Sequence, residues 1–287
     1  MNRVLVTGAA GFIGAKLCTR LVEEDVDVIG IDSASCLDAL DFIGRNANFQ
    51  LINEPIEEVD LTKIVKDRDT IFHLACSTSH NEAWGNIEQH VKRHIHRLKQ
   101  LTHSMERNKS KLIHVSSYEV YGRKTGTVSE ASSANPQSLY GLVKLTEENF
   151  IKATAADDPL SYMILRMPIV YGPGQSIESL GTEDCVSSIE RQSSCQDALY
   201  IDDAVKALLI SGASREREGI YNIGSGREGE WQKGLKFLAV KNEPSSVMKT
   251  RVLADKAREE LGFQQEVAIE EGLKKQKDAR QKRRKKK

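Results

Sequence analysis

The sequence predicts an α/β fold built on a doubly wound parallel sheet. Through the first half of the 287-residue chain, short apolar runs alternate with helical patterns, and a glycine-rich turn directly follows the first run. Strands that alternate with helices form βαβ units, and their right-handed crossovers produce one parallel sheet. The length suits one large α/β domain, or such a domain with a smaller appendage.

Each predicted element rests on a short apolar run or on helical periodicity. Strands are expected at 4–7, 25–32, 49–52, 71–74, 112–115, 163–167 and 220–223, and helices at 12–24, 86–107, 139–156 and 202–211. From Tyr171 the pattern loosens into a polar Ser- and Gly-rich segment, and 231–273 show helical patterns without strand alternation. Because ligands of open α/β sheets bind beyond the carboxyl ends of the strands, these looser segments are candidates for a substrate lid.

The formal net charge of zero combines two unlike parts of the chain. Residues 274–287 contain ten Lys or Arg and one Asp, which leaves 31 basic and 40 acidic residues elsewhere. The acidic body gives no indication of a nucleic-acid surface. A block of like charge is expected to be disordered, so 273–287 are interpreted as a solvated basic tail, with contact to a nucleic acid or an anionic surface as the alternative.

The cysteines and the first residues of the chain indicate the cellular compartment in which the protein is expected. The five cysteines form no C-x-x-C pair, so neither a disulfide framework nor a metal site is indicated. The chain opens on a predicted strand, which leaves no room for a signal peptide. No apolar run reaches about 18 residues, as a membrane-spanning helix requires. We therefore expect a cytoplasmic protein with reduced thiols and no membrane segment.

The strongest motif is the glycine-rich turn in VLVTGAAGFIGAKL (4–17). Gly8, Gly11 and Gly14 follow a strand and open a helix, with Phe12 and Ile13 between the last two. Glycine permits the tight turn, and the missing Cβ lets the backbone approach a pyrophosphate at the helix N-terminus. The arrangement predicts a Rossmann-type dinucleotide site.

Asp32 ends the second predicted strand, 18 residues after Gly14. A carboxylate at this place accepts hydrogen bonds from the ribose hydroxyls of NAD and repels the 2′-phosphate of NADP. Ser33 and Ala34 follow it, so no adjacent arginine offers a phosphate clamp. The sequence therefore predicts NAD as the cofactor.

Tyr140 and Lys144 lie four residues apart on a predicted helix and therefore share one face. A lysine ammonium beside a phenol lowers the pKa of the tyrosine from about 10. Such a phenol could remove a hydroxyl proton while a hydride leaves for NAD. Ser116 and Ser117 end the fifth predicted strand, where one hydroxyl could hydrogen-bond the reacting oxygen.

Several histidines also lie on predicted elements. His90 and His94 are four residues apart on one helix, a spacing that suits a metal, but no nearby Cys or carboxylate completes a site. A polar helix face is the expectation for them. His73 and His114 lie within predicted strands and are interpreted as hydrogen-bonded core or edge residues.

A series of ordered blocks connects these motifs. They are TGAAGFIG (7–14), DTIFHLAC (69–76), HVSSYEVYG (114–122), LYGLVKLTEE (139–148), LRMPIVYGPGQ (165–175), LYIDDAVKAL (199–208), IYNIGSG (220–226) and LADKAREELGF (253–263). Together they resemble the extended short-chain dehydrogenase/reductases, specifically the NAD-dependent epimerase/dehydratase family. The resemblance covers nearly all of 1–272.

The resemblance implies roles for individual residues. Ser117, Tyr140 and Lys144 match the family's catalytic triad, and Lys144 would also hold the nicotinamide ribose. The further NAD contacts that it implies are Ser33 beside Asp32, Glu54 near the adenine, Leu74, Ala75 and Cys76 along the cofactor, and the backbone of Pro168 at the nicotinamide amide.

The departures from the family lie mainly on the substrate side. Relatives usually have Asn where this chain has Ile169, and a longer insert than residues 174–199. We therefore expect a Rossmann domain at 1–170, completed by 196–225, and a small, reduced C-terminal substrate lobe at 171–195 and 226–272.

Three residues are the expected substrate contacts: Glu119, Ile169 and Arg191, the last as the best remaining cation for a diphosphate. Standard 4,6-dehydratases of the family usually carry Asp-Glu after the catalytic Thr, whereas Tyr118-Glu119 follow Ser117 here. This difference argues against a standard 4,6-dehydratase.

The family implies a nucleotide-sugar epimerase of the 4-epimerase type, in which the sugar is oxidised transiently and tightly bound NAD returns the hydride. The alternatives are an NAD-dependent dehydrogenase, reductase, dehydratase or decarboxylase of a sugar or smaller carbonyl compound, and an NAD-binding protein without turnover. Relatives are often dimers, so a homodimer through helices 86–107 and 139–156 is expected.

Overall fold

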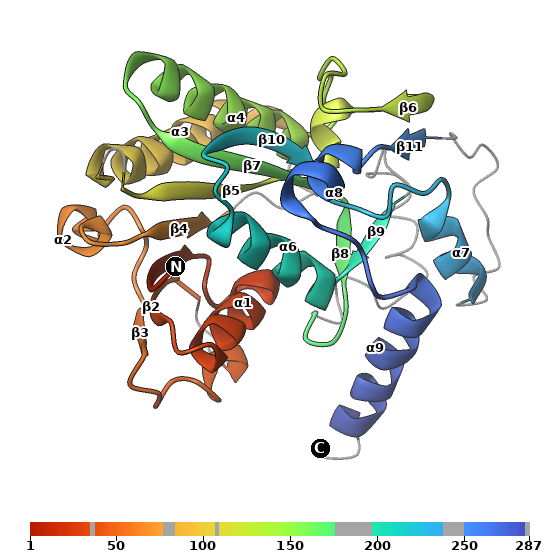
Figure 1. Cartoon of the computed structure of the whole chain (residues 1–287), viewed down its shortest axis with the longest axis horizontal. Coiled ribbons are helices and arrows are strands. Elements are labelled where there is room, and N and C mark those ends of the chain that lie inside the picture. Colours follow the sequence, from red (N-terminus) through yellow and green to blue (C-terminus); the bar gives the residue numbers. More distant parts are fainter. Residues whose placement is uncertain (35–37, 77–83, 107–108, 176–196, 238–249, 285–287) are drawn as a thin grey trace.

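The structure, a computed structural model, describes residues 1–34, 38–76, 84–106, 109–175, 197–237 and 250–284. Within these ranges, seven parallel strands form one sheet in the order β10-β7-β5-β4-β1-β2-β3 (Figure 1). The strands are β1 (Arg3–Thr7), β2 (Asp27–Ile31), β3 (Phe49–Ile52), β4 (Thr70–His73), β5 (Lys111–Ser117), β7 (Ser161–Met167) and β10 (Glu218–Asn222). The order reverses between β1 and β4, which confirms the predicted doubly wound Rossmann-type fold.

Both faces of the sheet are buried because successive strand residues point to opposite sides. Val4 and Val6 of β1 belong to one apolar cluster, whereas Leu5 between them belongs to the other. In β7, Met163 belongs to the first cluster and Ile164 to the second. Such near-continuous apolar runs are typical of a parallel sheet covered on both faces.

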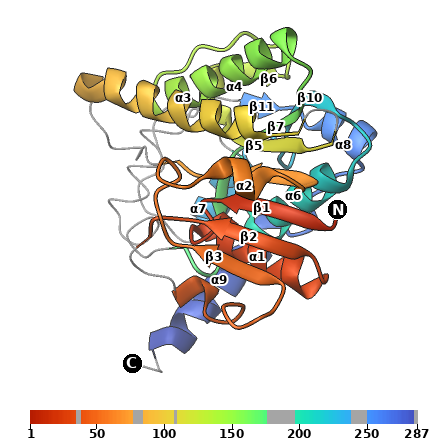
Figure 2. The same ribbon diagram turned by 90° about the vertical axis from the view of Figure 1, so that its left-hand side faces the viewer.

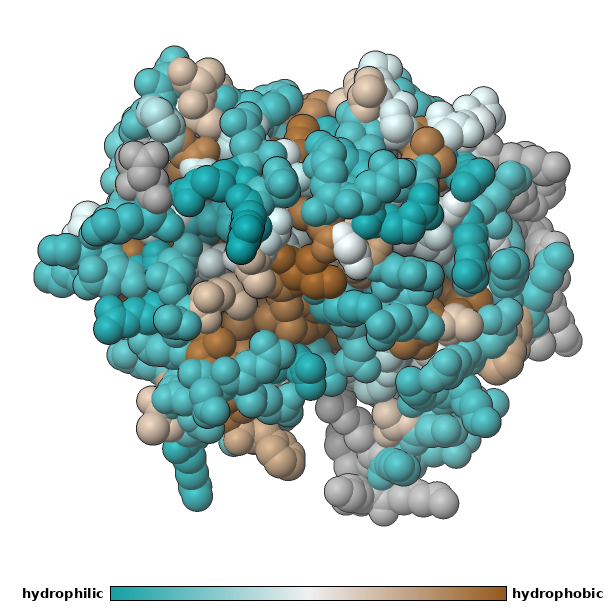
Figure 3. All heavy atoms as spheres, viewed as in Figure 1, coloured by the Kyte–Doolittle hydropathy of each residue, from teal (hydrophilic) through white to brown (hydrophobic). Residues whose placement is uncertain are grey.

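Helices cover the two faces of the sheet (Figures 1 and 2). Helices α1 (Phe12–Glu23) and α6 (Ile201–Ala213) lie on one side, and α2 (Leu61–Val65), α3 (Ile87–Ser104) and α4 (Leu139–Asp157) lie on the other. The short helices η1 (Asp38–Leu40), η2 (Trp84–Asn86) and η3 (Tyr118–Tyr121) lie in the connections. Hydrophilic residues cover most of the face in Figure 3, and apolar ones gather near its centre, around α6. Among the described helices, none is both long and apolar enough to span a membrane.

Two short parallel strand pairs lie outside the main sheet, and the sequence pattern did not predict them. Strand β8 (Ile169–Tyr171) pairs with β9 (Ala198–Tyr200), and β6 (Gly126–Val128) pairs with β11 (Thr250–Val252). Each has three residues, too few for the two-residue periodicity to be recognised. Helices α7 (Glu230–Phe237) and α8 (Asp255–Leu261) complete this part of the molecule. The domain bounds given above stay a prediction.

The basic tail differs from the expected disorder. Residues Ile269–Arg284 form helix α9, which extends away from the body toward the C-terminus in Figure 1. Its first turns pack on the core through buried Ile269 and Leu273, and the Gln276 amide donates to the Gly172 carbonyl at 3.2 Å. Lys and Arg are good helix formers, so the anchored helix continues through the charged segment. The prediction of a disordered tail at 273–287 is therefore wrong over 273–284.

Candidate active site

A pocket of about 460 Å³ lies at the carboxyl ends of β1, β4, β5 and β7. This is the sheet edge at which the sequence predicted ligand binding. The predicted site residues that line the pocket are Gly8, Gly11, Phe12, Ile13, Gly14, Leu74, Cys76, Ser117, Glu119, Tyr140, Lys144, Pro168 and Ile169. Residues from distant parts of the sequence therefore meet in one cleft.

The glycine-rich turn has the close backbone approach that its sequence predicted. Gly8 has φ +75°, and a Cβ there would lie 2.8 Å from the amide nitrogen of Ala75. A Cβ on Gly14 would lie 2.0 Å from the carbonyl oxygen of Gly8. Gly11 precedes α1 and supplies no side-chain cap, which leaves the first-turn N–H groups available at the pocket end of the helix. This cradle fits a pyrophosphate.

Asp32, directly after β2, accepts a hydrogen bond from the same turn. One carboxylate oxygen accepts a hydrogen bond from the Ala10 amide at 2.8 Å, and the other accepts one from the Ala34 amide at 2.9 Å. Each oxygen keeps a second lone pair, which could accept a hydroxyl of a ribose. The half-buried carboxylate thus joins the turn to the second strand.

Four predicted cofactor residues lie outside the pocket lining: Asp32, Ser33, Glu54 and Ala75. Ser33 and Glu54 are exposed at the ends of β2 and β3, and Ala75 lies behind Gly8. Their contacts with NAD stay predictions. Arg191 lies outside the described residues.

Ser117, at the end of β5, is linked to the start of α4. Its hydroxyl accepts from the Glu119 amide at 3.1 Å, and the Glu119 carboxylate accepts a hydrogen bond from the Ser138 hydroxyl. Ser138 caps α4 by accepting from the Gly141 amide at 3.0 Å. Through these contacts Ser117 and the first turn of α4, which carries Tyr140, are held on the same side of the cleft.

The Tyr140 phenol does not have the lowered pKa that the sequence predicted. Its burial raises the pKa, and this effect outweighs the lowering by Lys144, whose ammonium lies 5.9 Å from the ring centroid. The negative charges of Glu119 and Glu147 act in the same direction as burial. The expectation considered only the Tyr–Lys spacing and missed the surrounding acids and the burial of the phenol.

Lys144 forms an ion pair with Glu147, three residues later on α4, at 3.0 Å. Burial lowers the pKa of Lys144, but the negative charges of Glu147, Cys76 and Tyr140, with the hydrogen bond to Glu147, together outweigh burial and raise it. Sequence reasoning missed Glu147, although its i, i+3 spacing from Lys144 was a usable signal.

A second buried pair lies next to Ser116, which lines the pocket. Glu148 accepts a 2.5 Å hydrogen bond from the Ser116 hydroxyl and pairs with Arg166 of β7 at 2.6 Å. Arg166 also donates to the Tyr121 hydroxyl at 2.8 Å. Since a buried charge is costly unless paired, this network fixes β5, α4 and β7 relative to one another.

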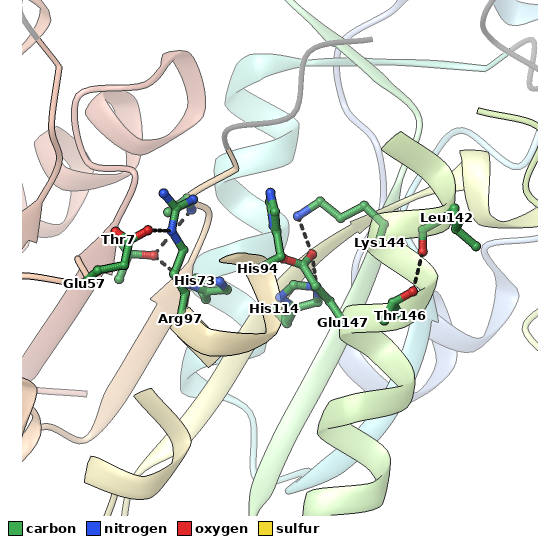
Figure 4. Close-up of polar contacts among 11 residues, drawn as sticks. Thr7, Glu57, His73, His94, Arg97, His114, Leu142, Lys144, Thr146 and Glu147 are labelled. Atoms are coloured by element: carbon green, nitrogen blue, oxygen red, sulfur yellow. Dashed lines mark hydrogen bonds and ion pairs between the residues drawn. The ribbon is translucent and has the colours of Figure 1, made fainter. Parts of the chain in front are cut away.

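The histidines are arranged differently from the expectation for α3. His94 is buried rather than on a polar face, and its Nδ1 lies 2.7 Å from a Glu147 carboxylate oxygen (Figure 4). His73 and His114 are buried in neighbouring strands, as predicted, with rings stacked at 5.6 Å. Burial lowers the pKa of both. Within the described residues, no group of three or more His, Cys, Asp or Glu side chains is placed to hold a metal.

Several pocket residues carried no recognised signal in the sequence. They are mainly apolar residues in the last part of a strand or shortly after one: Val115, Tyr118, Met167, Val170 and Gln175. Single apolar residues at strand ends are indistinguishable from core residues until the sheet is assembled.

Comparison with known proteins shows a clear relationship. The model of the NAD dependent epimerase/dehydratase family matches residues 4–224. A Bacillus subtilis (strain 168) protein named uncharacterized UDP-glucose epimerase YtcB is 35% identical over 191 residues, which cover 60% of this chain and 58% of that protein. The dTDP-4-dehydro-6-deoxyglucose reductase of Escherichia coli is 27% identical over 304 residues, which cover 95% of each.

A solved structure is similar over nearly the whole chain. The UDP-glucuronic acid 4-epimerase of Bacillus cereus in complex with NAD has a TM-score of 0.83 and 26% identity to this chain, with 98% of this chain and 99% of that one covered.

Proposed function

The chain belongs to the NAD-dependent epimerase/dehydratase family, and on that premise we propose that it is a UDP-sugar 4-epimerase. It is an NAD-dependent enzyme of this family. The observation that carries the proposal is the single cleft in which Ser117, Tyr140 and Lys144 face the glycine-rich turn. The similarity to a UDP-glucuronic acid 4-epimerase over nearly the whole chain supports it and makes UDP-glucuronic acid the first candidate substrate.

The chain's own residues provide the proton chemistry of such a reaction. Once Tyr140 has lost its own proton, its phenolate accepts the proton of the sugar hydroxyl and later returns a proton to the same oxygen. Lys144 stabilises the phenolate by its positive charge, and the Ser117 hydroxyl donates a hydrogen bond to the reacting oxygen. Ile169 and Glu119 line the same cleft and are proposed to contact the sugar.

The glycine-rich turn would hold the NAD pyrophosphate, and Asp32 would accept the adenosine ribose hydroxyls. NAD, when bound, would accept a hydride from the sugar carbon.

The test is to incubate the protein and its Tyr140→Phe variant with NAD and a panel of UDP-, dTDP-, GDP- and CDP-sugars. Proton NMR follows the anomeric signals while absorbance follows NADH. We expect a new epimer signal without net NADH, and a rate reduced by about 10²–10⁴-fold in the variant. Retained NAD binding in Tyr140→Phe is the control for folding. No new sugar signal and no NADH with any member of the panel, while NAD still binds, would favour a binding protein without turnover.

A second candidate is a dehydrogenase or reductase, which the similarity to the E. coli reductase favours. Net production or consumption of NADH in step with the sugar product would identify it, because an epimerase returns its hydride. A dehydratase or decarboxylase would show a change in product mass.

We also propose the homodimer expected through helices 86–107 and 139–156. Sedimentation velocity of the purified protein distinguishes a dimer from a monomer of 32.0 kDa.

A further inference from the structure

A buried cluster of ionisable groups lies directly behind the catalytic lysine. Figure 4 shows Glu147 of α4 with Lys144, His94 of α3 and His114 of β5 directed toward its carboxylate. One oxygen lies 2.7 Å from His94 Nδ1, and the other lies 3.0 Å from Lys144 Nζ and 3.4 Å from His114 Nε2. All four side chains are almost completely buried.

The cluster continues from the catalytic helix to the nucleotide-binding turn. The His114 ring stacks on His73 of β4, and His73 Nδ1 lies 2.8 Å from the Thr7 hydroxyl. Thr7 is the last residue of β1, directly before Gly8. The lysine is therefore linked through Glu147, His114 and His73 to three neighbouring strands, β5, β4 and β1.

We propose that Glu147 is a positioning residue for Lys144: it holds the lysine ammonium beside Tyr140. The positive charge of Lys144 is then shared between the Tyr140 phenol and the buried Glu147 carboxylate. This inference rests on the proposed use of Tyr140 as the base. Lys144 cannot give its full charge to the phenolate while it is paired with Glu147, so Tyr140 becomes a weaker acid. The pairing in turn holds the ammonium in one place and keeps it protonated although it is buried.

The surrounding charges are consistent with this role. Besides Lys144 and Glu147, the groups that act on the Tyr140 phenol are Cys76, which follows β4, and Glu119 of η3. His94, His114 and Lys144 face Glu147 from three different elements, and together they lower the pKa of its carboxyl despite burial. Glu148, next along the helix, is instead paired with Arg166. Among the contacts of the described residues, Glu147 is thus the acid that lies within ion-pair distance of Lys144.

The experiment measures the ionisation of Tyr140 in the NAD-bound protein by its tyrosinate absorbance. Subtracting the titration of Tyr140→Phe isolates this phenol from the other six tyrosines of the chain. The same difference is then measured in Glu147→Gln, which keeps the shape of the side chain and removes its charge, and in Glu147→Asp, which keeps the charge.

We expect Glu147→Gln to move the Tyr140 midpoint to lower pH by about 1 unit or more, and Glu147→Asp to keep it near the wild-type value. An unchanged midpoint in Glu147→Gln, or an equal shift in both variants, would overturn the proposal. The titration needs no sugar, so absence of turnover across the sugar panel would count against the proposed function alone.

If Glu147→Gln does not fold, a crystal structure of the native protein with NAD decides the question. We expect Lys144 Nζ to remain within about 4 Å of a Glu147 carboxylate oxygen. A lysine directed away from Glu147 would overturn the proposal.

Discussion

At the scale of single residues, Gly14 shows how strongly the proposed cofactor site depends on a missing side chain. A Cβ there would meet the Gly8 carbonyl oxygen at 2.0 Å, and a backbone oxygen cannot move aside as a flexible side chain can. We expect Gly14→Ala to weaken NAD binding at least ~10-fold, or about 1.4 kcal/mol, and to destabilise the fold by about 1–3 kcal/mol. Calorimetric NAD titration and thermal unfolding measure the two effects.

The matched control is Gly44→Ala, because a Cβ at this glycine would have its nearest neighbour, the Leu40 carbonyl oxygen, at 3.5 Å. That separation is an ordinary van der Waals contact, so this variant should bind NAD as the wild type does. Equal losses in both variants would mean that Gly14 has no special role.

Asp197 makes a second prediction at this scale, about pH. Its buried carboxylate accepts hydrogen bonds from the amides of Ala198 and Ser225, but burial raises its pKa from 3.8 to about 6. Because the folded-state pKa exceeds the unfolded one, the folded protein binds more protons between these values. The contribution of Asp197 to stability therefore falls as pH rises through this window.

The comparison is with Asp197→Asn, which cannot ionise. The stability of the wild type relative to this variant should fall by up to about 3 kcal/mol between about pH 4 and pH 6.5. Urea unfolding at several pH values provides the measurement. A difference that stays constant, or grows with pH, would show that the carboxylate is not disfavoured in the fold.

At the scale of elements, α9 combines an anchored beginning with a charged continuation. Leu273 is buried in the core cluster, whereas Lys274 and Lys277 are exposed. We expect Leu273→Ala to lower the free energy of unfolding by about 2–5 kcal/mol. Deletion of residues 279–287 should cost less than about 1 kcal/mol, because it removes no described core contact.

Denaturant unfolding of the two variants tests this difference. A deletion as damaging as Leu273→Ala would mean that the basic end of the helix also packs on the body.

The elements that the sequence predicted well are those long enough to show a period. The strands of the main sheet and helices α1, α3, α4 and α6 lie where their patterns placed them, within a few residues. The three-residue strands β6, β8, β9 and β11 were missed because their pairing depends on segments far apart in the chain. For α9, the like-charge rule considered the tail alone and not the helix that anchors it.

The site could be predicted to a similar depth. The glycine turn, Ser117, Tyr140 and Lys144 carry local motifs, and the structure brings them to one pocket. The raised pKa of Tyr140 and the buried place of His94 could not be predicted, because both depend on side chains that meet only after folding.

At the scale of the whole molecule, the sheet places the glycine-rich turn and the proposed catalytic residues at one edge. The strand order places β4 between β1, whose end carries the glycine-rich turn, and β5, which ends at Ser117. Helix α4 then lays Tyr140 and Lys144 over the same edge. The turn proposed to hold the cofactor and the proposed base, Tyr140, therefore belong to opposite halves of a doubly wound sheet and meet where the strand order reverses.

In the proposed reaction, a sugar carbon is oxidised and reduced again within this one cleft. The decisive experiment uses UDP-glucuronic acid that carries deuterium at C4, incubated with the NAD-bound protein in ordinary water and analysed by NMR. We predict a C4 epimer that retains the deuterium at C4, with no net NADH, and no such product from Tyr140→Phe. Loss of the deuterium to water during epimerisation, or its accumulation in NADH, would contradict the proposed reaction.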